Sequence, residues 1–453
     1  MRALLDRSLT GLARLALRGF FRELEVVGRE HIPRGRPLLI VANHFNALLD
    51  PVLVMHAFRR LPRFVAKAAL WRPVWARPLL WIAGMVPVHR PQEGGDTDRN
   101  RSTFATCHDQ LARGRTVALF PEGGLSRVPM LRRLRTGAAR IAIGARRTGA
   151  EQLAIVPVGL LYEDKVALRS RALVRIGAPI ELDEHLERCG DTAATPDDHG
   201  AVRRLTDEIE RRLAALAPVY RDEREAAVLG TAADIALREP DRLPPRAAPL
   251  SRREELARQL ATAPSCVRER IHDALARYHL GLSLLGLRDA YLVADYRLRR
   301  LAGLLLVTAL KLAAVAPFAL VGAAANALPY WAVHWTGRLV ADPALRASAR
   351  LLAGVALFPT TWLVLAWLAP WDAWTARLGI VVVLPALGLI AVRALEQMVA
   401  VHRTWRGWIA LIERRGELEQ LRTDRQLLVD LVEQTADGTY PAEAGSQGPS
   451  STR

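Results

Sequence analysis

Short apolar runs alternate with segments of helical periodicity over the first 220 residues of this 453-residue chain. An apolar run of about four to eight residues is typical of a buried strand, whereas apolar residues three or four positions apart are typical of a helix facing a core. This alternation predicts an α/β domain over residues 23–220, with a mostly parallel or mixed sheet flanked by helices. The strands are expected at residues 23–27, 38–42, 117–120, 154–161 and 172–176, and the helices include 101–113, 138–147 and 201–216.

Residues 1–22 carry apolar positions at helical spacing that are interrupted by charges such as Asp6 and Arg14. A signal peptide needs an uncharged apolar core, so we expect an amphipathic helix instead. This helix either lies in a membrane interface or packs on the domain. Residues 71–82, rich in Trp, Leu and Arg, leave the same choice between an interfacial element and a core helix.

Residues 301–394 contain long apolar stretches. Residues 301–337 hold one charge, Lys311, and residues 351–371 and 378–392 hold none. Because a membrane-crossing helix needs about 20 apolar residues, this part predicts an α-helical membrane-spanning region. The last two stretches are expected to form a hairpin, and the first to combine one span with a re-entrant or interfacial piece. Arginines flank the region on both sides, which favours two or four crossings with both flanks in the cytoplasm.

Two further segments have a different composition. Residues 221–300 are rich in Arg, Glu and Ala around a proline cluster, which predicts a helical connector interrupted by a linker. Residues 395–453 begin with opposite charges three or four positions apart, as on a solvated helix. From about residue 435 the chain is rich in Gly, Ser, Pro and Thr, which is typical of a disordered tail.

The formal net charge of +17 favours an anionic partner. Nucleic acid is not expected, because the chain has no zinc-finger, helix-turn-helix or aromatic-basic RNA motif. Anionic membrane lipids fit better, since the same chain carries the apolar stretches. The three cysteines have no paired spacing, so we expect neither a metal site nor a disulfide framework.

A histidine and an aspartate follow the strand expected at residues 38–42. His44 and Asp50 lie on the turn that leaves this strand, where a rigid element can hold reactive groups in place. A histidine whose proton is positioned by a carboxylate is a general base for a hydroxyl group. The chain has 11 histidines, most of which are expected to be structural, so this interpretation depends on the motifs that follow.

The stretch from Asn43 to Pro51 resembles the first signature of the glycerolipid acyltransferases, the family that acylates glycerol-3-phosphate and lysophosphatidate. Four residues separate His from Asp in that signature, and five separate His44 from Asp50 here. The form N-H-x-N-x-x-x-D-P is similar to the branch that contains the yeast-type glycerol-3-phosphate/dihydroxyacetone-phosphate acyltransferases and their bacterial relatives.

Three further blocks follow in the order of the family. Residues 84–90 (GMVPVHR), 120–127 (FPEGGLSR) and 156–159 (VPVG) resemble the second, third and fourth signatures. The third is usually written F-P-E-G-x-R-S, and its arginine is replaced by Leu125 here. The resemblance covers about residues 20–215. The candidate replacements for that arginine are Arg127, Arg132, Arg133 and Arg135.

The resemblance implies roles for individual residues. His44 would deprotonate the acceptor hydroxyl, and Asp50 would fix the tautomer of His44 and stabilise the imidazolium, so no Ser or Cys nucleophile is needed. Arg90 would bind the phosphate of the acceptor, although it can also be read as an ordinary surface arginine. The substrate-binding residues implied in this way are Asn43, Asn46, Arg90, Glu122, Gly123, Gly124, Ser126, Arg127 and Pro157.

The third and fourth blocks leave alternatives open. Glu122 would form a hydrogen bond with a glycerol hydroxyl, and Gly123 and Gly124 would let the backbone approach a ligand and stabilise an oxyanion. The same three residues also fit an ordinary turn, and Pro157 also fits a purely structural position.

The resulting hypothesis is an O-acyltransferase of phospholipid synthesis in the cytoplasmic membrane, with its catalytic domain facing the cytoplasm. It would need no cofactor. The donor and co-substrate would be acyl-CoA or acyl-ACP, and the acceptor glycerol-3-phosphate or a lysophospholipid such as lysophosphatidate. The alternatives are a lysophospholipid acyltransferase of another head-group specificity, a non-catalytic membrane scaffold or lipid-binding protein on the same fold, and a transporter built on residues 301–394.

Overall fold

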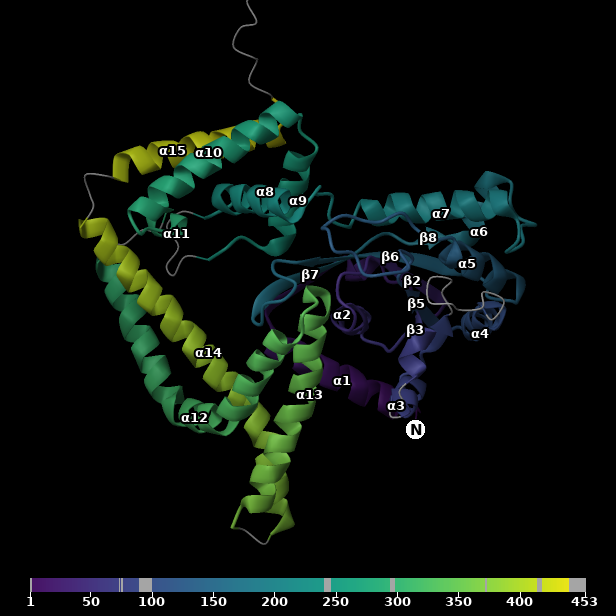
Figure 1. The fold of residues 1–453 in the computed structure, drawn as a ribbon, viewed down its shortest axis with the longest axis horizontal. Helices are drawn as coiled ribbons and strands as arrows, with labels where there is room; N and C mark the ends of the chain where they lie inside the picture. Colours follow the sequence, from purple (N-terminus) through teal and green to yellow (C-terminus); the bar gives the residue numbers. More distant parts are fainter. Residues whose placement is uncertain are drawn as a thin grey trace, which may run out of the picture. The chain divides into compact units, whose positions relative to one another are not determined.

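The structure is a computed structural model that describes residues 2–72, 74, 76–88, 100–239, 246–293, 298–370, 373–413 and 418–439. The chain forms two compact units (Figure 1). The first comprises Met1–Val219 and Ala325–Val382, and the second comprises Tyr220–Ala324 and Val383–Arg453. Each unit is described by itself below.

A mixed sheet forms the centre of the first unit, as the sequence predicts. Within the described residues it has eight strands in the order β1-β7-β6-β2-β5-β3-β4, and β8 pairs with β6. All pairs are parallel except those that β6 makes with β7 and β8. The strands are β1 (Phe21–Val27), β2 (Leu38–Ala42), β3 (Arg63–Lys67), β4 (Val86–Val88), β5 (Thr116–Leu119), β6 (Ala154–Tyr162), β7 (Ser170–Ile176) and β8 (Ile180–Glu181).

Helices flank the sheet and continue beyond it. In the first half of the chain they are α1 (Arg2–Phe20), η1 (Arg29–His31), α2 (Leu49–Phe58), η2 (Ala68–Trp71), α3 (Ala76–Ile82), α4 (Asn100–Ala112), α5 (Gly137–Arg147), α6 (Leu182–Cys189) and α7 (His199–Ala214). The later helices are α8 (Glu223–Ala236), α9 (Leu250–Ala261), α10 (Ser265–Leu284), α11 (Asp289–Val293), α12 (Leu298–Leu339), α13 (Pro343–Leu368), α14 (Trp374–Glu413) and α15 (Leu418–Ala436).

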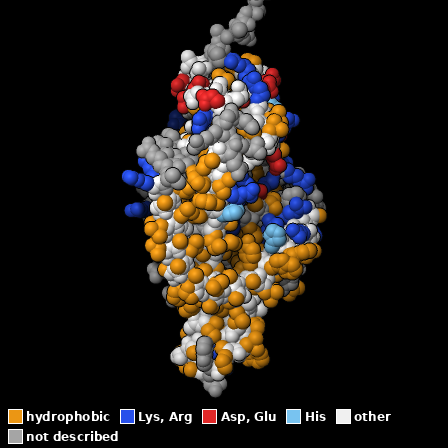
Figure 2. Space-filling view, turned by 90° about the vertical axis from the view of Figure 1, so that its left-hand side faces the viewer, with side chains coloured by type: hydrophobic (Ala, Val, Ile, Leu, Met, Phe, Trp, Pro, Cys, Tyr) orange, Lys and Arg blue, Asp and Glu red, His pale blue; other side chains and the backbone are white. Residues whose placement is uncertain are grey.

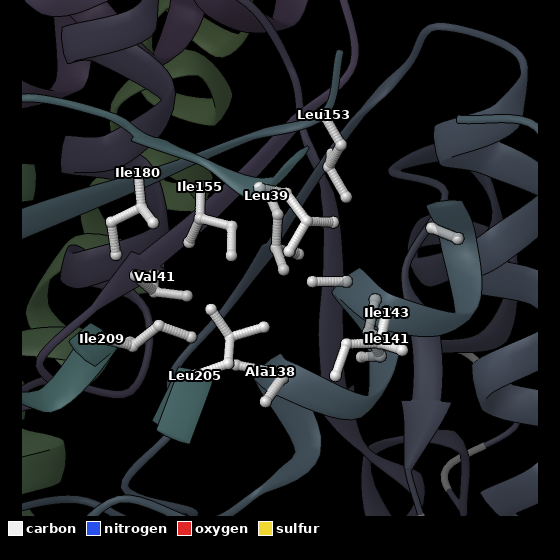
Figure 3. Close-up of a cluster of buried hydrophobic side chains, with 14 of the residues drawn as sticks. Leu39, Val41, Ala138, Ile141, Ile143, Leu153, Ile155, Ile180, Leu205 and Ile209 are labelled. Atoms are coloured by element: carbon white, nitrogen blue, oxygen red, sulfur yellow. The ribbon is translucent and has the colours of Figure 1, made fainter. Parts of the chain in front are cut away.

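The sheet is buried on both faces, which explains the uninterrupted apolar sequence of β2. Successive side chains of a strand point to opposite faces. Leu39 and Val41 therefore enter one core, together with residues of α4, α5 and α7 (Figure 3). Leu38, Ile40 and Ala42 enter the other core, together with residues of α1, α2 and α13. The central strand is thus held rigidly between two packed layers.

Several predicted elements take a more specific form in the structure. The amphipathic helix α1 packs on the first unit through Leu17 and Phe20, which are buried in the second of these cores. Residues 71–82 contribute to η2 and α3, and the Trp81 side chain is 80% exposed, so it lies outside the core. Strands β3, β4 and β8 were not predicted, because they are short and β3 has a basic residue at each end, Arg63 and Lys67.

Three helices among the described residues are long and apolar enough to cross a membrane: Arg299–Leu339, Leu345–Leu368 and Trp374–Ile412. Large apolar side chains such as Leu328 and Trp367 lie exposed on them. Figure 2 shows hydrophobic side chains over much of the molecular surface on the side that it views. Such extensive apolar exposure indicates association with a membrane. The number of crossings stays a prediction.

Of the two alternatives for the piece, which was expected around residues 326–331, the re-entrant one is wrong, because α12 runs through these residues as a continuous helix. The interfacial alternative stays a prediction. The polar side chain of Asn326 has a partner on the next helix. Asn326 Oδ1 accepts a hydrogen bond of 2.8 Å from the indole N–H of Trp362 in α13. A polar group within an apolar helix is satisfied in this way without interrupting the helix.

The second unit contains helices from the predicted connector and from the charged tail. α8, α9, α10 and α15 share one apolar core. A buried carboxylate, Asp289 of α11, accepts hydrogen bonds from the side chains of Tyr278, Arg238 and Arg425 at 2.6–2.8 Å, which ties α11 to α10, to α15 and to the segment just after α8. Residues 240–245 of the predicted linker and 440–453 of the predicted disordered tail lie outside the described residues.

Candidate functional site

The turn after β2 brings His44 to Asp50. The carboxylate lies in the first turn of α2, and the distance from His44 Nδ1 to Asp50 Oδ2 is 2.8 Å. The side chain of Asp50 is completely buried, and that of His44 is 14% exposed. The five residues between them therefore fold into a connection that closes the pair.

Asp50 is held by several donors besides the histidine. Its Oδ2 atom accepts hydrogen bonds from the backbone N–H groups of Phe45 (2.6 Å) and Asn46 (2.8 Å), and its Oδ1 atom accepts one from the hydroxyl of Tyr162. Burial raises the pKa of Tyr162 well above its ordinary value, and the neighbouring Asp50 raises it further. The phenol therefore keeps its proton and donates a hydrogen bond to Asp50. A buried carboxylate needs partners of this kind.

These contacts also orient the imidazole of His44. An ionised carboxylate only accepts hydrogen bonds, so the proton between Nδ1 and Asp50 belongs to Nδ1, and Nε2 presents its lone pair. The ring stacks on Phe120, with 4.0 Å between the ring centroids and 9° between the planes. The arrangement fixes the plane and the orientation of the imidazole; the role of His44 as a general base stays a prediction.

Glu122 supports the backbone on both sides of this site. It lies after β5 and is buried. Its Oε1 atom accepts a hydrogen bond from the backbone N–H of His44 at 2.8 Å, and its Oε2 atom accepts one from the backbone N–H of Arg132 at 3.3 Å. Burial raises the pKa of Glu122 to about 7, against the opposing effect of these two N–H groups and of the Arg132 charge. The carboxyl group was predicted to form a hydrogen bond with a glycerol hydroxyl. In the structure it joins the turn at His44 to the loop at Arg132.

Three further predicted residues hold the same turn. Asn43 continues the pairing of β2 with β6, because its side chain donates to Leu160 O (2.9 Å) and accepts from Leu160 N–H (2.7 Å). Ser126 is buried; its N–H donates to His44 O at 2.7 Å, and its hydroxyl donates to Val128 O at 3.0 Å. Asn46 is also fully buried. Whether any of them contacts a substrate stays a prediction.

The turn at Gly123 and Gly124 is covered by two arginines. Gly123 has a left-handed backbone (φ +70°), and a Cβ atom there would collide with the side chain of Arg135. A Cβ atom on Gly124 would lie 3.4 Å from Arg132 Nη1. Of the cations considered as replacements at Leu125, Arg132 and Arg135 therefore lie against this turn.

Arg127, another of those cations, extends from the surface instead. Its side chain is 84% exposed, and its Nη2 atom lies 3.7 Å from Asp342 Oδ2. Pro157 lies buried inside β6, paired with Val41 of β2, and not on the loop that carries His44. Arg90 lies outside the described residues.

Tyr162 and Phe120 complete the site, although no role was predicted for either residue from the sequence. Phe120 belongs to the third block but was treated as a strand residue. Tyr162 is the last residue of β6, next to the strand predicted at residues 154–161. The pairing of β2 with β6 would have placed Tyr162 near the turn, but that pairing is a tertiary feature.

The raised pKa of Glu122 predicts a pH-dependent stability. Because the folded protein holds this proton up to about pH 7 and the unfolded chain releases it near the ordinary Glu value of about 4.3, stability falls as the pH rises between these values. The effect is of the order of 3 kcal/mol. Thermal unfolding of the wild type and of Glu122→Gln, measured across this range in detergent, should show a clearly flatter profile for the variant. Parallel profiles would contradict this assignment.

Comparisons with known proteins find similarity over the part of the chain that contains this site. The family model described as Acyltransferase matches residues 23–161. Over 85 residues, or 18% of this chain, the sequence is 38% identical to glycerol-3-phosphate O-acyltransferase 2 of Saccharomyces cerevisiae, covering 11% of that protein. Over 145 residues, or 31% of this chain, it is 30% identical to a 1-acyl-sn-glycerol-3-phosphate acyltransferase of Chlamydomonas reinhardtii, covering 39% of it.

A solved structure, the 1-acyl-sn-glycerophosphate acyltransferase of Thermotoga maritima, is 19% identical and covers 46% of this chain and 77% of its own, with a TM-score of 0.34. The chain spans between about a tenth and a half of the length of the curated relatives that it matches. His44, Asp50, Glu122 and Ser126 all lie within the matched range. Residues 23–161 of this chain are therefore similar to the acyltransferase family.

Proposed function

We propose that this protein is a membrane-associated O-acyltransferase that moves a fatty acyl group from acyl-CoA or acyl-ACP to a hydroxyl of glycerol-3-phosphate or lysophosphatidate. One observation carries the proposal: His44 Nδ1 lies 2.8 Å from a buried, fully hydrogen-bonded Asp50. This geometry leaves Nε2 as a base for an acceptor hydroxyl.

The transfer follows from this arrangement. Nε2 of His44 takes the proton of the acceptor hydroxyl as the oxygen attacks the thioester carbonyl, and Asp50 stabilises the imidazolium that forms. The tetrahedral intermediate then collapses, the C–S bond breaks, and the imidazolium returns its proton to the departing thiolate. The products are an ester and a free thiol. General-base assistance of this kind contributes roughly 10²–10⁴-fold to the rate.

The phosphate of the acceptor would be bound by guanidinium groups beside the turn at Gly123. Guanidinium groups suit phosphate because they form paired, charge-assisted hydrogen bonds. Arg132 and Arg135 lie against this turn, next to Glu122. We propose that they supply the charge that Leu125 does not, together with Arg90 from the second block.

We favour glycerol-3-phosphate as the acceptor, because the stretch from Asn43 to Pro51 has the yeast-type form. Two glycerol-3-phosphate O-acyltransferases of Saccharomyces cerevisiae are among the relatives, at 38% and 32% identity. Lysophosphatidate is the alternative acceptor, supported by relatives named 1-acyl-sn-glycerol-3-phosphate acyltransferases.

The membrane location fits a reaction whose product is a lipid. The three apolar helices would anchor the protein, and its net charge of +17 would favour anionic lipids. The arginines that flank the helices favour a catalytic domain on the cytoplasmic side. Leu125, in place of the arginine of the third block, favours a second candidate function, a non-catalytic lipid-binding protein on the same fold.

Replacing the base separates the two functions. His44→Ala should reduce thiol release from acyl-CoA in the presence of glycerol-3-phosphate by roughly 10²–10⁴-fold, because the hydroxyl then attacks without a base. Membrane association should be unchanged. His279→Ala, which removes an exposed histidine on α10, is the control. Equal activity of His44→Ala and the wild type would exclude the proposed base, and an inactive wild type would favour the lipid-binding function.

Replacing the arginines tests the phosphate site. Arg132→Ala and Arg135→Ala should each raise the KM for glycerol-3-phosphate about 10-fold or more, because a charge-assisted hydrogen bond is lost, while the KM for acyl-CoA stays constant. Arg113→Ala removes an exposed arginine just after α4 and is the control. The same small change in all three variants would show that this turn does not bind the acceptor.

A further inference from the structure

The helix α13 begins inside the core of the acyltransferase domain. Ala347 and Leu351 are buried in the same apolar cluster as Leu49 and Leu53 of α2. Figure 1 shows this end of α13 beside α1 and α2, and residue contacts join it to both helices. Farther along, α13 exposes large apolar side chains such as Leu363. One helix thus combines a candidate membrane span with a part of the domain core.

A hydroxyl on this helix contacts the turn that carries the catalytic pair. The backbone N–H of Leu48 donates a hydrogen bond of 3.0 Å to Ser348 Oγ, and the two residues are 300 positions apart in the sequence. Ser348 is buried. Leu48 is the N-cap residue of α2, two positions before Asp50. The hydroxyl therefore acts at the start of the helix that bears the carboxylate.

This bond satisfies a need that α2 does not meet by itself. The first N–H groups of a helix have no partner within the helix, and a side-chain oxygen at the N-cap usually accepts from one of them. Leu48 has no such oxygen, and within the described residues α2 shows no side-chain cap of its own. Ser348 instead accepts from the N–H of the N-cap residue itself, a donor that an N3 side chain usually satisfies and that Pro51 at N3 cannot.

Two further contacts hold the same stretch of chain on the domain. Arg350 Nη1 donates to Val166 O at 2.6 Å, in the loop between β6 and β7. Asp342, just before α13, lies 3.7 Å from Arg127 in the third block. Residues 342–351 thus contact the turn after β2, the loop after β5 and the loop between β6 and β7.

We infer that residues 342–351 position the catalytic site, and that Ser348 does so by fixing the turn between His44 and Asp50. The inference rests on the proposed function. Ser348 is a positioning residue, because it acts on the carboxylate through the backbone of Leu48 and not on the substrate. Loss of its hydroxyl would make the first turn of α2 more mobile. The distance between His44 Nδ1 and the Asp50 carboxylate would then vary.

The test compares hydroxyl variants of α13 in the full-length protein reconstituted in phospholipid vesicles. Ser348→Ala should lower kcat about 10-fold, because a small displacement of a catalytic group is costly, while the KM values for acyl-CoA and glycerol-3-phosphate stay constant. Ser348→Thr keeps the hydroxyl and should retain the wild-type kcat. Thr360→Val is the control, because the Thr360 hydroxyl bonds to Ala356 O within α13.

Ser348→Cys keeps the size of the side chain with a weaker acceptor, and its kcat should lie between those of Ser348→Ala and the wild type. A wild-type kcat in Ser348→Cys and in Ser348→Ala overturns the inference; if Ser348→Ala does not fold, Ser348→Cys decides alone. His44→Ala is assayed in parallel. If it is active, the proposed function fails; if it is inactive while the Ser348 variants match the wild type, only the positioning role fails.

Discussion

Asp50 carries a carboxylate with no exposed surface, and such a group is stable in a protein interior only when donors surround it. Those donors come from the histidine, from the turn that follows β2 and from the end of β6. Satisfying this one carboxylate therefore defines the path of the turn between His44 and α2. The same bonds orient the imidazole, so one set of contacts would meet both the requirement of folding and that of the proposed catalysis.

The rest of the structure supports that set. β2 is buried between two cores, so the turn leaves a strand that cannot shift. Glu122 attaches the backbone of His44 to the loop after β5, and Asn43 attaches it to β6. On the other side of the turn, α13 reaches α2 through Ser348. A candidate membrane span is in this way part of the packing of the turn that carries His44.

Much of the site could be predicted from the sequence, because its parts are local. The apolar run of β2, the turn residues after it and the turn at Glu122 are each readable within a few positions, and the α/β fold follows from their alternation. Tyr162 and Ser348 could not be assigned in this way, since each acquires its contacts through pairing or packing between distant segments. The continuity of α12 was missed for the same reason, because Asn326 is satisfied by Trp362 on another helix. For the missing cation the sequence left four arginines open, and the structure places Arg132 and Arg135 of these against the turn at Gly123.

A double-mutant cycle on His44 and Asp50 tests the central claim most directly. The measured quantity is kcat/KM for acyl transfer to glycerol-3-phosphate in the wild type, His44→Ala, Asp50→Asn and the double variant. If the two residues act as a unit, each single variant loses most of the activity, and the double variant is about as active as His44→Ala. Losses that multiply in the double variant would mean that Asp50 acts independently of His44 and would contradict the account.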